Sequence, residues 1–529
     1  MSSSEVNKSA PDIQDVLSPN RDDDSNLKKR NFSRSSMLAL CVSLMATWEA
    51  LTSVMAAGLV SGGPVSLVYG MIVAVIGSTC SAMSLSELAS VQPTAGGQYH
   101  FVAHLSPESI RKGAGWLGGY ISLLGWIAVT GSAPFLSGTQ IQGLLVLNYS
   151  EQGYVFERWH GTLIYWAILI FSTVVCVFCN GVLPLIQKLT MTLHVILFFT
   201  FIIVMCVLAP TKNSAEFVFT SFLNNSGWES DGVAWCIGLL SSAYVLVGYD
   251  SATHLGEEME NPAIGIPFAM VGSVVANGVM GFGFLIALLF CMGDIDSALS
   301  TNTGFPIIQI FYTITGSKAA ASVMVGLVSF MAMLSTIALQ TSASRMLWAF
   351  ARDQAVPWSR VISRIDEKRN VPTVAILIIT VLLMLLGLIN IGSTTAFNAI
   401  LSLAVVGLQT SYLMPICLVL WRRIAVPDTL TWGPWRMGKA GVVVNIVAIL
   451  YLGFTCVFLL FPPYQPVTAE NMNYAPVVLG GMVLLGGLYW IVFARKQYFG
   501  PLVETPETAL YPPPKSTYKA KDGEIVAPA

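Results

Sequence analysis

Residues 187–209 read QKLTMTLHVILFFTFIIVMCVLA. From Leu189 to Ala209 this stretch holds no Asp, Glu, Lys or Arg, and most of its side chains are apolar. A helix of about 20 such residues is long enough to cross the hydrocarbon core of a bilayer. The stretch therefore predicts a membrane-spanning helix.

Eleven further apolar stretches follow the same pattern along the 529 residues, of which 54% are hydrophobic and 11% charged. An ordinary soluble domain has roughly a quarter of its residues charged. We therefore predict an all-α integral membrane protein with 12 transmembrane helices. The predicted spans are 37–60, 65–89, 115–146, 161–179, 187–209, 233–256, 266–292, 319–343, 373–391, 396–420, 440–461 and 476–494.

The basic residues predict the orientation, because Lys and Arg near span ends prefer the cytoplasmic side. With the amino terminus inside, the outer loops hold three: Arg158, Lys212 and Lys318. The inner loops hold thirteen, namely Arg111, Lys112, Lys188, Arg345, Arg352, Arg360, Arg364, Lys368, Arg369, Arg422, Arg423, Arg436 and Lys439. Both termini are therefore predicted to be cytoplasmic. The net charge of −2, with basic residues spread over many loops, argues against a nucleic-acid partner.

Two clear carboxylates, Glu49 and Asp250, lie in the interior of the predicted spans, where basic residues are almost absent. An ionisable group near the bilayer centre costs at least roughly 2.5 kcal/mol, so it usually faces a cavity or a partner. This asymmetry favours a cationic group in a transported solute. The alternative is that each acid is protonated or hydrogen-bonded between helices, and Asp250 also suits a gate because it lies nearer the cytoplasmic end.

Spans 1 and 6 carry similar short runs, Trp48-Glu49-Ala50 and Tyr249-Asp250-Ser251. Transporters built from inverted repeats place their sites at interrupted helices in corresponding positions. We predict helix breaks at Thr47 to Leu51 and at Tyr244 to Gly248. The amides at a break suit a carboxylate, and the rings of Trp48 and Tyr244 suit an ammonium group or serve only in packing.

Three more polar residues are candidates for coupling to an ion. His194 lies inside span 5 and titrates near neutral pH, so it suits a proton carrier or a packing histidine. Ser335 and Thr336 lie in the middle of span 8, where their hydroxyls either line an ion site or bond back to their own helix. No metal site and no cofactor is predicted.

The chain resembles the amino acid–polyamine–organocation superfamily, and within it the fungal branch of GABA and choline permeases. The matching motifs are Glu87-Leu88-Ala89 with Pro93-Thr94-Ala95-Gly96-Gly97-Gln98-Tyr99, then Gly248-Tyr249-Asp250 with His254, Glu257-Glu258, Asn261-Pro262 and Ile266-Pro267, then Ser344-Arg345-Met346 with Ala349-Phe350-Ala351-Arg352-Asp353, and finally Ala396-Phe397-Asn398-Ala399.

The resemblance implies a five-plus-five inverted-repeat core of the LeuT type, with spans 1 and 6 unwound at their centres and usually proton-coupled uptake. It divides the chain into a cytoplasmic tail predicted to be disordered (1–35), a transport core (36–420), two added helices (421–495) and a second such tail (496–529). Bacterial relatives carry Gly-Ser-Gly where this chain has Trp48-Glu49-Ala50, and this difference favours direct contact between Glu49 and the amine.

These features predict a permease for GABA or a related amino acid, driven by proton symport. A choline or polyamine permease is the alternative of the same kind, and a nutrient receptor that binds without transporting is a third. The expected partners are a small amine-bearing solute, the lipid bilayer and a coupling proton. The plasma membrane is the expected location, with an internal membrane as the alternative. An enzyme is not expected, because the spans offer no nucleophile–base pair in one cavity.

Overall fold

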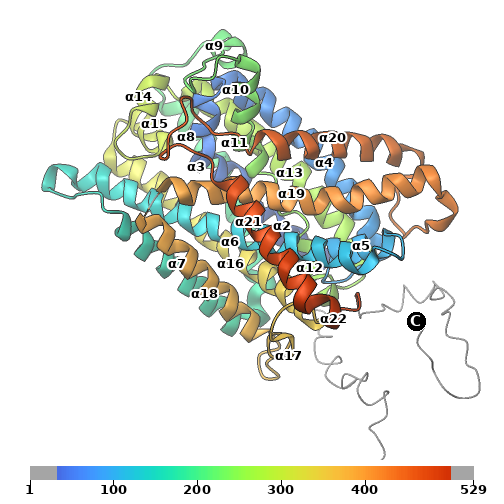
Figure 1. Cartoon of the computed structure of the whole chain (residues 1–529). Helices are drawn as coiled ribbons and strands as arrows, with labels where there is room; N and C mark the ends of the chain where they lie inside the picture. Colours follow the sequence, from blue (N-terminus) through green and yellow to red (C-terminus); the bar gives the residue numbers. More distant parts are fainter. Residues whose placement is uncertain (1–31, 393, 502–529) are drawn as a thin grey trace, which may run out of the picture.

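The computed structural model describes residues 32–392 and 394–501, and these are helical with a few isolated β-bridges and no named strand (Figure 1). Eleven helices in this part of the chain are long and apolar enough to cross a membrane. They are α2 with α3 (Arg34–Met45, Thr47–Val60), α4 (Gly63–Val91), α6 (Arg111–Tyr149), α7 (Arg158–Phe178), α8 (Leu183–Leu208), α13 (Pro262–Cys291), α16 (Lys318–Arg352), α18 (Thr373–Gly392), α19 (Thr394–Ala425), α20 (Gly441–Phe458) and α21 (Ala475–Tyr489) continued by α22 (Arg495–Gln497).

The remaining predicted span, 233–256, is not a continuous helix, which agrees with the break predicted at Tyr244 to Gly248. It consists of α10 (Asp231–Gly238), α11 (Leu240–Tyr244) and α12 (Ser251–His254). Residues 245–250 between α11 and α12 are not helical, and Gly248 has a φ of 90°. That left-handed conformation favours glycine, so the sequence itself breaks the helix there.

The first span breaks at Ala46, whose φ is 40°. The prediction of Thr47 to Leu51 as the break was wrong, because those residues form the first turns of α3. Asn277 of α13 explains the difference. Its Oδ1 accepts from the Thr47 N–H at 3.3 Å and its Nδ2 donates to the Val42 carbonyl at 3.3 Å. One side chain from a distant helix thus satisfies backbone groups on both sides of the break.

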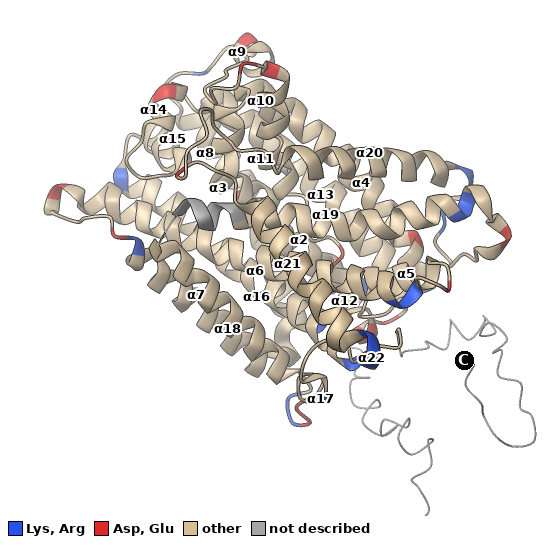
Figure 2. Cartoon of the chain, viewed as in Figure 1, with Lys and Arg blue, Asp and Glu red and all other residues tan. Residues whose placement is uncertain are grey.

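Shorter helices cover the two ends of the bundle (Figure 1). At one end lie α5 (Gln98–Leu105), α17 (Ser359–Ile362) and α22. At the other lie α9 (Ala215–Thr220), α14 (Ile295–Leu299) and α15 (Pro306–Thr315). We name these the inner and the outer end, after the orientation predicted from the sequence. Figure 2 shows Lys and Arg gathered near α5, α17 and α22, with Asp and Glu prominent near α9, α10 and α14.

The helices at the centre of the bundle pack on all sides, whereas those at its periphery expose apolar side chains. The broken first span contacts α8, α13 and α16, while α6 packs along both α16 and α19. On α8, by contrast, large apolar side chains such as Phe199, Ile203 and Val207 are exposed. Exposed apolar surface of this extent suits contact with lipid chains. The broken helices therefore sit among other helices, where unpaired backbone groups find partners.

Candidate functional site

A small cavity of about 40 Å³ lies beside the break at Ala46. It is lined by Glu49 and Ala50 of α3, by Tyr244 at the end of α11 and by Ser335 of α16, among mainly apolar neighbours. This volume holds a few water molecules at most, since each needs roughly 10–15 Å³. In this conformation the cavity is too small for an organic solute.

Glu49, which lines this cavity, keeps one carboxylate oxygen without a partner. Its Oε1 lies 2.8 Å from Nδ1 of His194 on α8, and both side chains are buried. Its Oε2 and the Nε2 of His194 have no hydrogen-bond partner among the described residues. A buried polar atom without a partner is costly, so such atoms commonly mark a place where a ligand, an ion or water binds. The pair can therefore accept a cation at Glu49 and a proton at His194.

A larger cavity of about 420 Å³ opens from the outer end and shares Ser53, Leu136 and Tyr244 with the small one. Its outer lining comes from the α14–α15 connection and from the segment between α20 and α21. The Tyr244 hydroxyl lies 2.7 Å from Oγ of Ser132 on α6. Tyr244 therefore stands between the outer cavity and Glu49, held by a single side-chain hydrogen bond.

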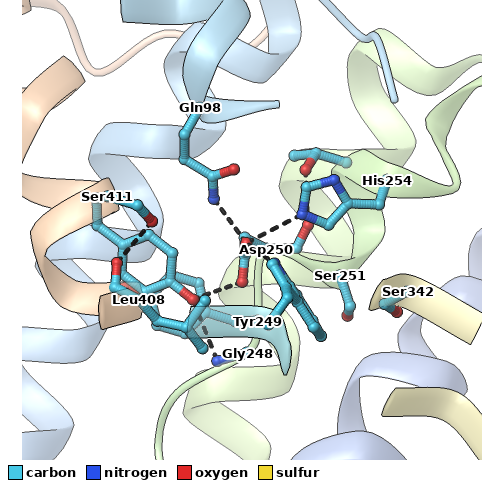
Figure 3. Close-up of polar contacts among 12 residues, drawn as sticks. Gln98, Gly248, Tyr249, Asp250, Ser251, His254, Ser342, Leu408 and Ser411 are labelled. Atoms are coloured by element: carbon cyan, nitrogen blue, oxygen red, sulfur yellow. Dashed lines mark hydrogen bonds and ion pairs between the residues drawn. The ribbon is translucent and has the colours of Figure 1, made fainter. Parts of the chain in front are cut away.

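Asp250 lies in a different environment, fully buried and surrounded by donors (Figure 3). Its Oδ2 accepts from Nε2 of Gln98 at 2.6 Å and from Nε1 of Trp126 at 3.1 Å, and it lies 3.3 Å from Nε2 of His254. Its Oδ1 accepts from the Tyr412 hydroxyl. Asp250 lines neither of the two cavities. It joins the unwound residues 245–250 to α5, α6 and α19, and so closes the bundle toward the inner end.

Two ion pairs reinforce the closed inner end. Arg352, at the end of α16, makes a two-pronged contact with Glu257 at 2.8 and 2.9 Å, and the Ala95 N–H donates to the same carboxylate at 3.0 Å. Arg345 pairs with Glu258 at 3.1 Å. Burial by itself would raise the pKa of Glu257, but the charge and hydrogen bonds of Arg352 lower it to about 2. Glu257 therefore stays ionised at neutral pH.

The other residues predicted in the first span divide between the cavity and the core. Ala50 lines the cavity, as described above, whereas Trp48 and Leu51 are fully buried and do not. The Trp48 ring packs against Phe201 and Phe284, with centroids 5.2 and 5.1 Å away. Thr47 ties the two broken spans together, because its hydroxyl donates to the Val245 carbonyl at 2.7 Å.

Tyr249 and the candidate hydroxyls of α16 make structural contacts. The Tyr249 ring packs 5.1 Å from that of Tyr412, and the Gly248 N–H donates to the Tyr412 hydroxyl at 3.3 Å. Ser335 donates to the Leu44 carbonyl beside the break at 2.7 Å, and Thr336 bonds back to its own helix. No cluster of metal-ligating residues occurs in the described ranges.

Sequence reasoning missed the partners of the candidate residues: Asn277 at the first break, and Gln98, Trp126, His254 and Tyr412 around Asp250. A polar Asn within the apolar stretch 262–291 was a usable signal for the first, since polar residues in membrane helices usually have a structural or functional partner. Gln98 and His254 belong to the motifs that carry the resemblance. Trp126 and Tyr412 had no distinguishing pattern.

Comparison with known proteins agrees with this architecture. The sequence profile of a family described as amino acid permease matches residues 32–483. A choline transporter of Saccharomyces cerevisiae is 33% identical over 89% of this chain and 82% of its own length. A GABA-specific permease of the same yeast is 30% identical over 89% and 83%, and an amino-acid permease of Arabidopsis thaliana is 30% identical over 90% and 93%. The chain therefore belongs to the amino acid permease family of the amino acid–polyamine–organocation superfamily, whose members are membrane transporters and not enzymes.

Proposed function

We propose that this permease carries a small solute with a cationic amine, which binds to Glu49 at the break of the first span. The free Oε2 of Glu49 carries this proposal, because it is a buried carboxylate oxygen at a cavity and has no partner in the described chain. The outer cavity supports the same proposal, since it shares Tyr244 with the small cavity that Glu49 lines.

The surroundings of Glu49 favour solutes whose amine is remote from any carboxylate. Glu49 occupies the first turn of α3, where the helix dipole favours an anion, and the Thr47 N–H already donates to Asn277. An α-amino acid would bring its own carboxylate close to that of Glu49. GABA separates the two groups, so its carboxylate can reach the hydroxyls of Ser53 or Tyr244. Choline and polyamines need no such partner, and no Lys or Arg among the described residues lines either cavity.

Proton symport is the proposed driving force, with His194 as the carrier. An ionised Glu49 can only accept, so Nδ1 of His194, 2.8 Å away, would donate to it, which leaves Nε2 as the position that takes up a proton. Protonation would turn a pair of net charge −1 into a neutral one. The net charge of the His194–Glu49 pair would then change with every cycle, and this change is the proposed link between the proton and the solute.

We also propose the five-plus-five inverted repeat. The two broken helices are the first and sixth predicted spans, and the two longest helices, α6 and α16, are the third and eighth. Short helices follow the second and the seventh spans, α5 at the inner end and α14 with α15 at the outer end. Corresponding features at opposite ends are what an inverted repeat produces. Both termini in the cytoplasm, and residence in the plasma membrane, belong to the same proposal.

Uptake of labelled solutes tests the proposal directly. Cells that lack their own carriers would express the chain or its Glu49→Gln variant, at two external pH values, with GABA, choline, putrescine, and neutral and basic α-amino acids as the panel. We expect GABA or choline to accumulate, faster at the lower pH. A panel of solutes that bind without accumulating would instead identify a receptor, and uptake of α-amino acids alone would contradict the proposed role of Glu49.

A further inference from the structure

His254 lies between two hydrogen-bond acceptors at the inner end of the broken sixth span (Figure 3). Its Nδ1 is 2.8 Å from the Ala95 carbonyl oxygen, and its Nε2 is 3.3 Å from Oδ2 of Asp250. A carbonyl oxygen only accepts, so Nδ1 must carry a hydrogen. In a neutral imidazole Nε2 would then be a bare lone pair facing a carboxylate oxygen. The contact therefore requires one additional proton between His254 and Asp250.

The other partners of Asp250 locate that proton. Gln98 and Trp126 both donate N–H groups to its Oδ2. The Tyr412 hydroxyl accepts from the Gly248 N–H, so its own hydrogen points to Oδ1 of Asp250. Three neutral donors directed at one carboxyl group favour its ionised form. We propose that His254 is a proton-binding site, doubly protonated and paired with an anionic Asp250, whenever the inner end is closed.

The groups around this pair do not supply an alternative positive charge. From α2, the Cys41 thiol lies 3.2 Å from the Ser251 hydroxyl, and from α19 and the unwound segment come the phenols of Tyr412 and Tyr249. These groups are neutral at physiological pH. No Lys or Arg in the described chain forms an ion pair with Asp250.

The charged groups nearest along the same contact are already paired. Glu257 binds the Ala95 N–H and forms its ion pair with Arg352, and Arg345 pairs with Glu258. On α5, His100 lies 3.0 Å from its own carboxylate partner, Asp353. The proton on His254 therefore decides whether the site at Asp250 is a neutral ion pair or an uncompensated buried anion.

Loss of this proton would destabilise the closed inner end. The Asp250–His254 pair joins α12 to α5, α6, α19 and the segment before α5, through Gln98, Trp126, Tyr412 and Ala95. An uncompensated buried charge is strongly destabilising, so deprotonation favours separation of these elements and entry of water. The role of this step in a transport cycle rests on the proposed function. The double protonation of His254 in the closed state does not.

The test follows the protonation of His254 and the closure of the inner end in one sample. The chain has five histidines, so ring-¹⁵N-histidine labelling of the full-length protein in lipid nanodiscs gives few signals, and His254→Gln assigns the one from His254. Closure is read with the Thr253→Cys variant. Thr253 is buried and packs closely against Gly97, the residue before α5: a Cβ added to Gly97 would lie 2.7 Å from the Thr253 hydroxyl. A thiol at position 253 therefore reacts with a reagent only when α12 and α5 separate.

Across a pH series, we expect doubly protonated His254 wherever the thiol at position 253 is protected, and the loss of both together as the pH rises. Labelling is measured relative to the unfolded protein at each pH, and the protected-to-reactive ratio should change by up to about tenfold per pH unit, the limit for one proton. His254→Gln should abolish this dependence. Protection of the introduced thiol with one bare ring nitrogen on His254, or labelling that does not follow the proton, overturns the proposal. No substrate is needed, so failure of the proposed transport function would be seen separately.

Glu257→Gln is the matched control, because it neutralises a neighbouring carboxylate whose partner is an arginine. A carboxylate with a lowered pKa contributes stability above its usual value of about 4.3 and loses it only as the pH falls through about 2. Glu257→Gln should therefore open the inner end by a similar factor at every pH in the series, and it should keep the dependence on His254. If Glu257→Gln lost the pH dependence, the titrating group would not be His254 and the proposal would be overturned.

Discussion

The two broken spans each carry a buried carboxylate that faces a histidine, Glu49 with His194 and Asp250 with His254, and the two pairs differ in what else surrounds them. Glu49 and His194 each keep an unpartnered atom, and Glu49 lines a cavity. Asp250 has three neutral donors besides its histidine and lines neither cavity. Burial is the same in both, so the number of partners distinguishes a carboxylate that can receive a cargo from one that seals the bundle.

The comparison of the two pairs depends first on which end of the bundle faces the cytoplasm. Tagging experiments decide this, and each tag should be either fully protected or fully reactive. Tags inserted after residue 20 and residue 515 should be protected from external reagents in intact cells, while a tag in the 148–158 loop should react. The asymmetry of thirteen inner against three outer basic residues is the physical reason. Labelling of either terminus would reverse the two ends, and Asp250 would then close the outer side.

Glu49→Gln should have the largest effect on binding. The variant keeps the shape and removes the charge, and a charge-assisted hydrogen bond contributes roughly 1.5–3 kcal/mol, or about ten- to a hundredfold in affinity. Equilibrium binding and accumulation of the transported amine should be measured in the same preparation, with surface expression as the control.

Three outcomes of that experiment separate the possible roles of Glu49. Weak binding supports contact with the amine. Normal binding and exchange without accumulation would make Glu49 the proton carrier. Normal binding with normal accumulation would leave it as a buried structural acid. Asp250→Asn, the matched variant of the other pair, should weaken binding from the outer side less than Glu49→Gln does, since Asp250 lines neither cavity.

The sequence predicted eleven of the twelve spans and the presence of Glu49, His194 and Asp250 inside the bundle, because each depends on local composition. The roles of these three residues stay predictions. A charge within an apolar stretch is visible without any knowledge of packing. What surrounds each charge was not predictable: His194 reaches Glu49 across 145 residues, and Tyr412 reaches Asp250 across 162. The shift of the first break from Thr47 to Ala46 has the same origin, since Asn277 lies 230 residues from Thr47.

His194→Ala should affect the pH dependence of uptake more than it affects binding. If His194 carries the coupling proton, its removal should flatten the response of uptake to external pH while the affinity for the amine falls only several-fold, through the lost hydrogen bond to Glu49. Initial uptake rates over a range of pH, beside binding at one pH, give both values. An unchanged pH profile would assign His194 to packing. His254→Gln in the same assay tells whether the inner pair contributes to the response.

The smallest expected effect concerns the barrier above the Glu49 pair, where Tyr244 makes one hydrogen bond to Ser132. Tyr244→Phe keeps the ring and removes that bond, worth about 1 kcal/mol, so entry from the outer cavity should become up to about fivefold faster. Rapid-mixing measurement of the association rate tests this. Because the bond joins two hydroxyls, Ser132→Ala should give a similar gain, and the double variant should add little to either single one. Independent, additive gains would show that Tyr244 is held by its packing instead. In that case the outer barrier would resemble the sealed surroundings of Asp250 more than the free side of Glu49.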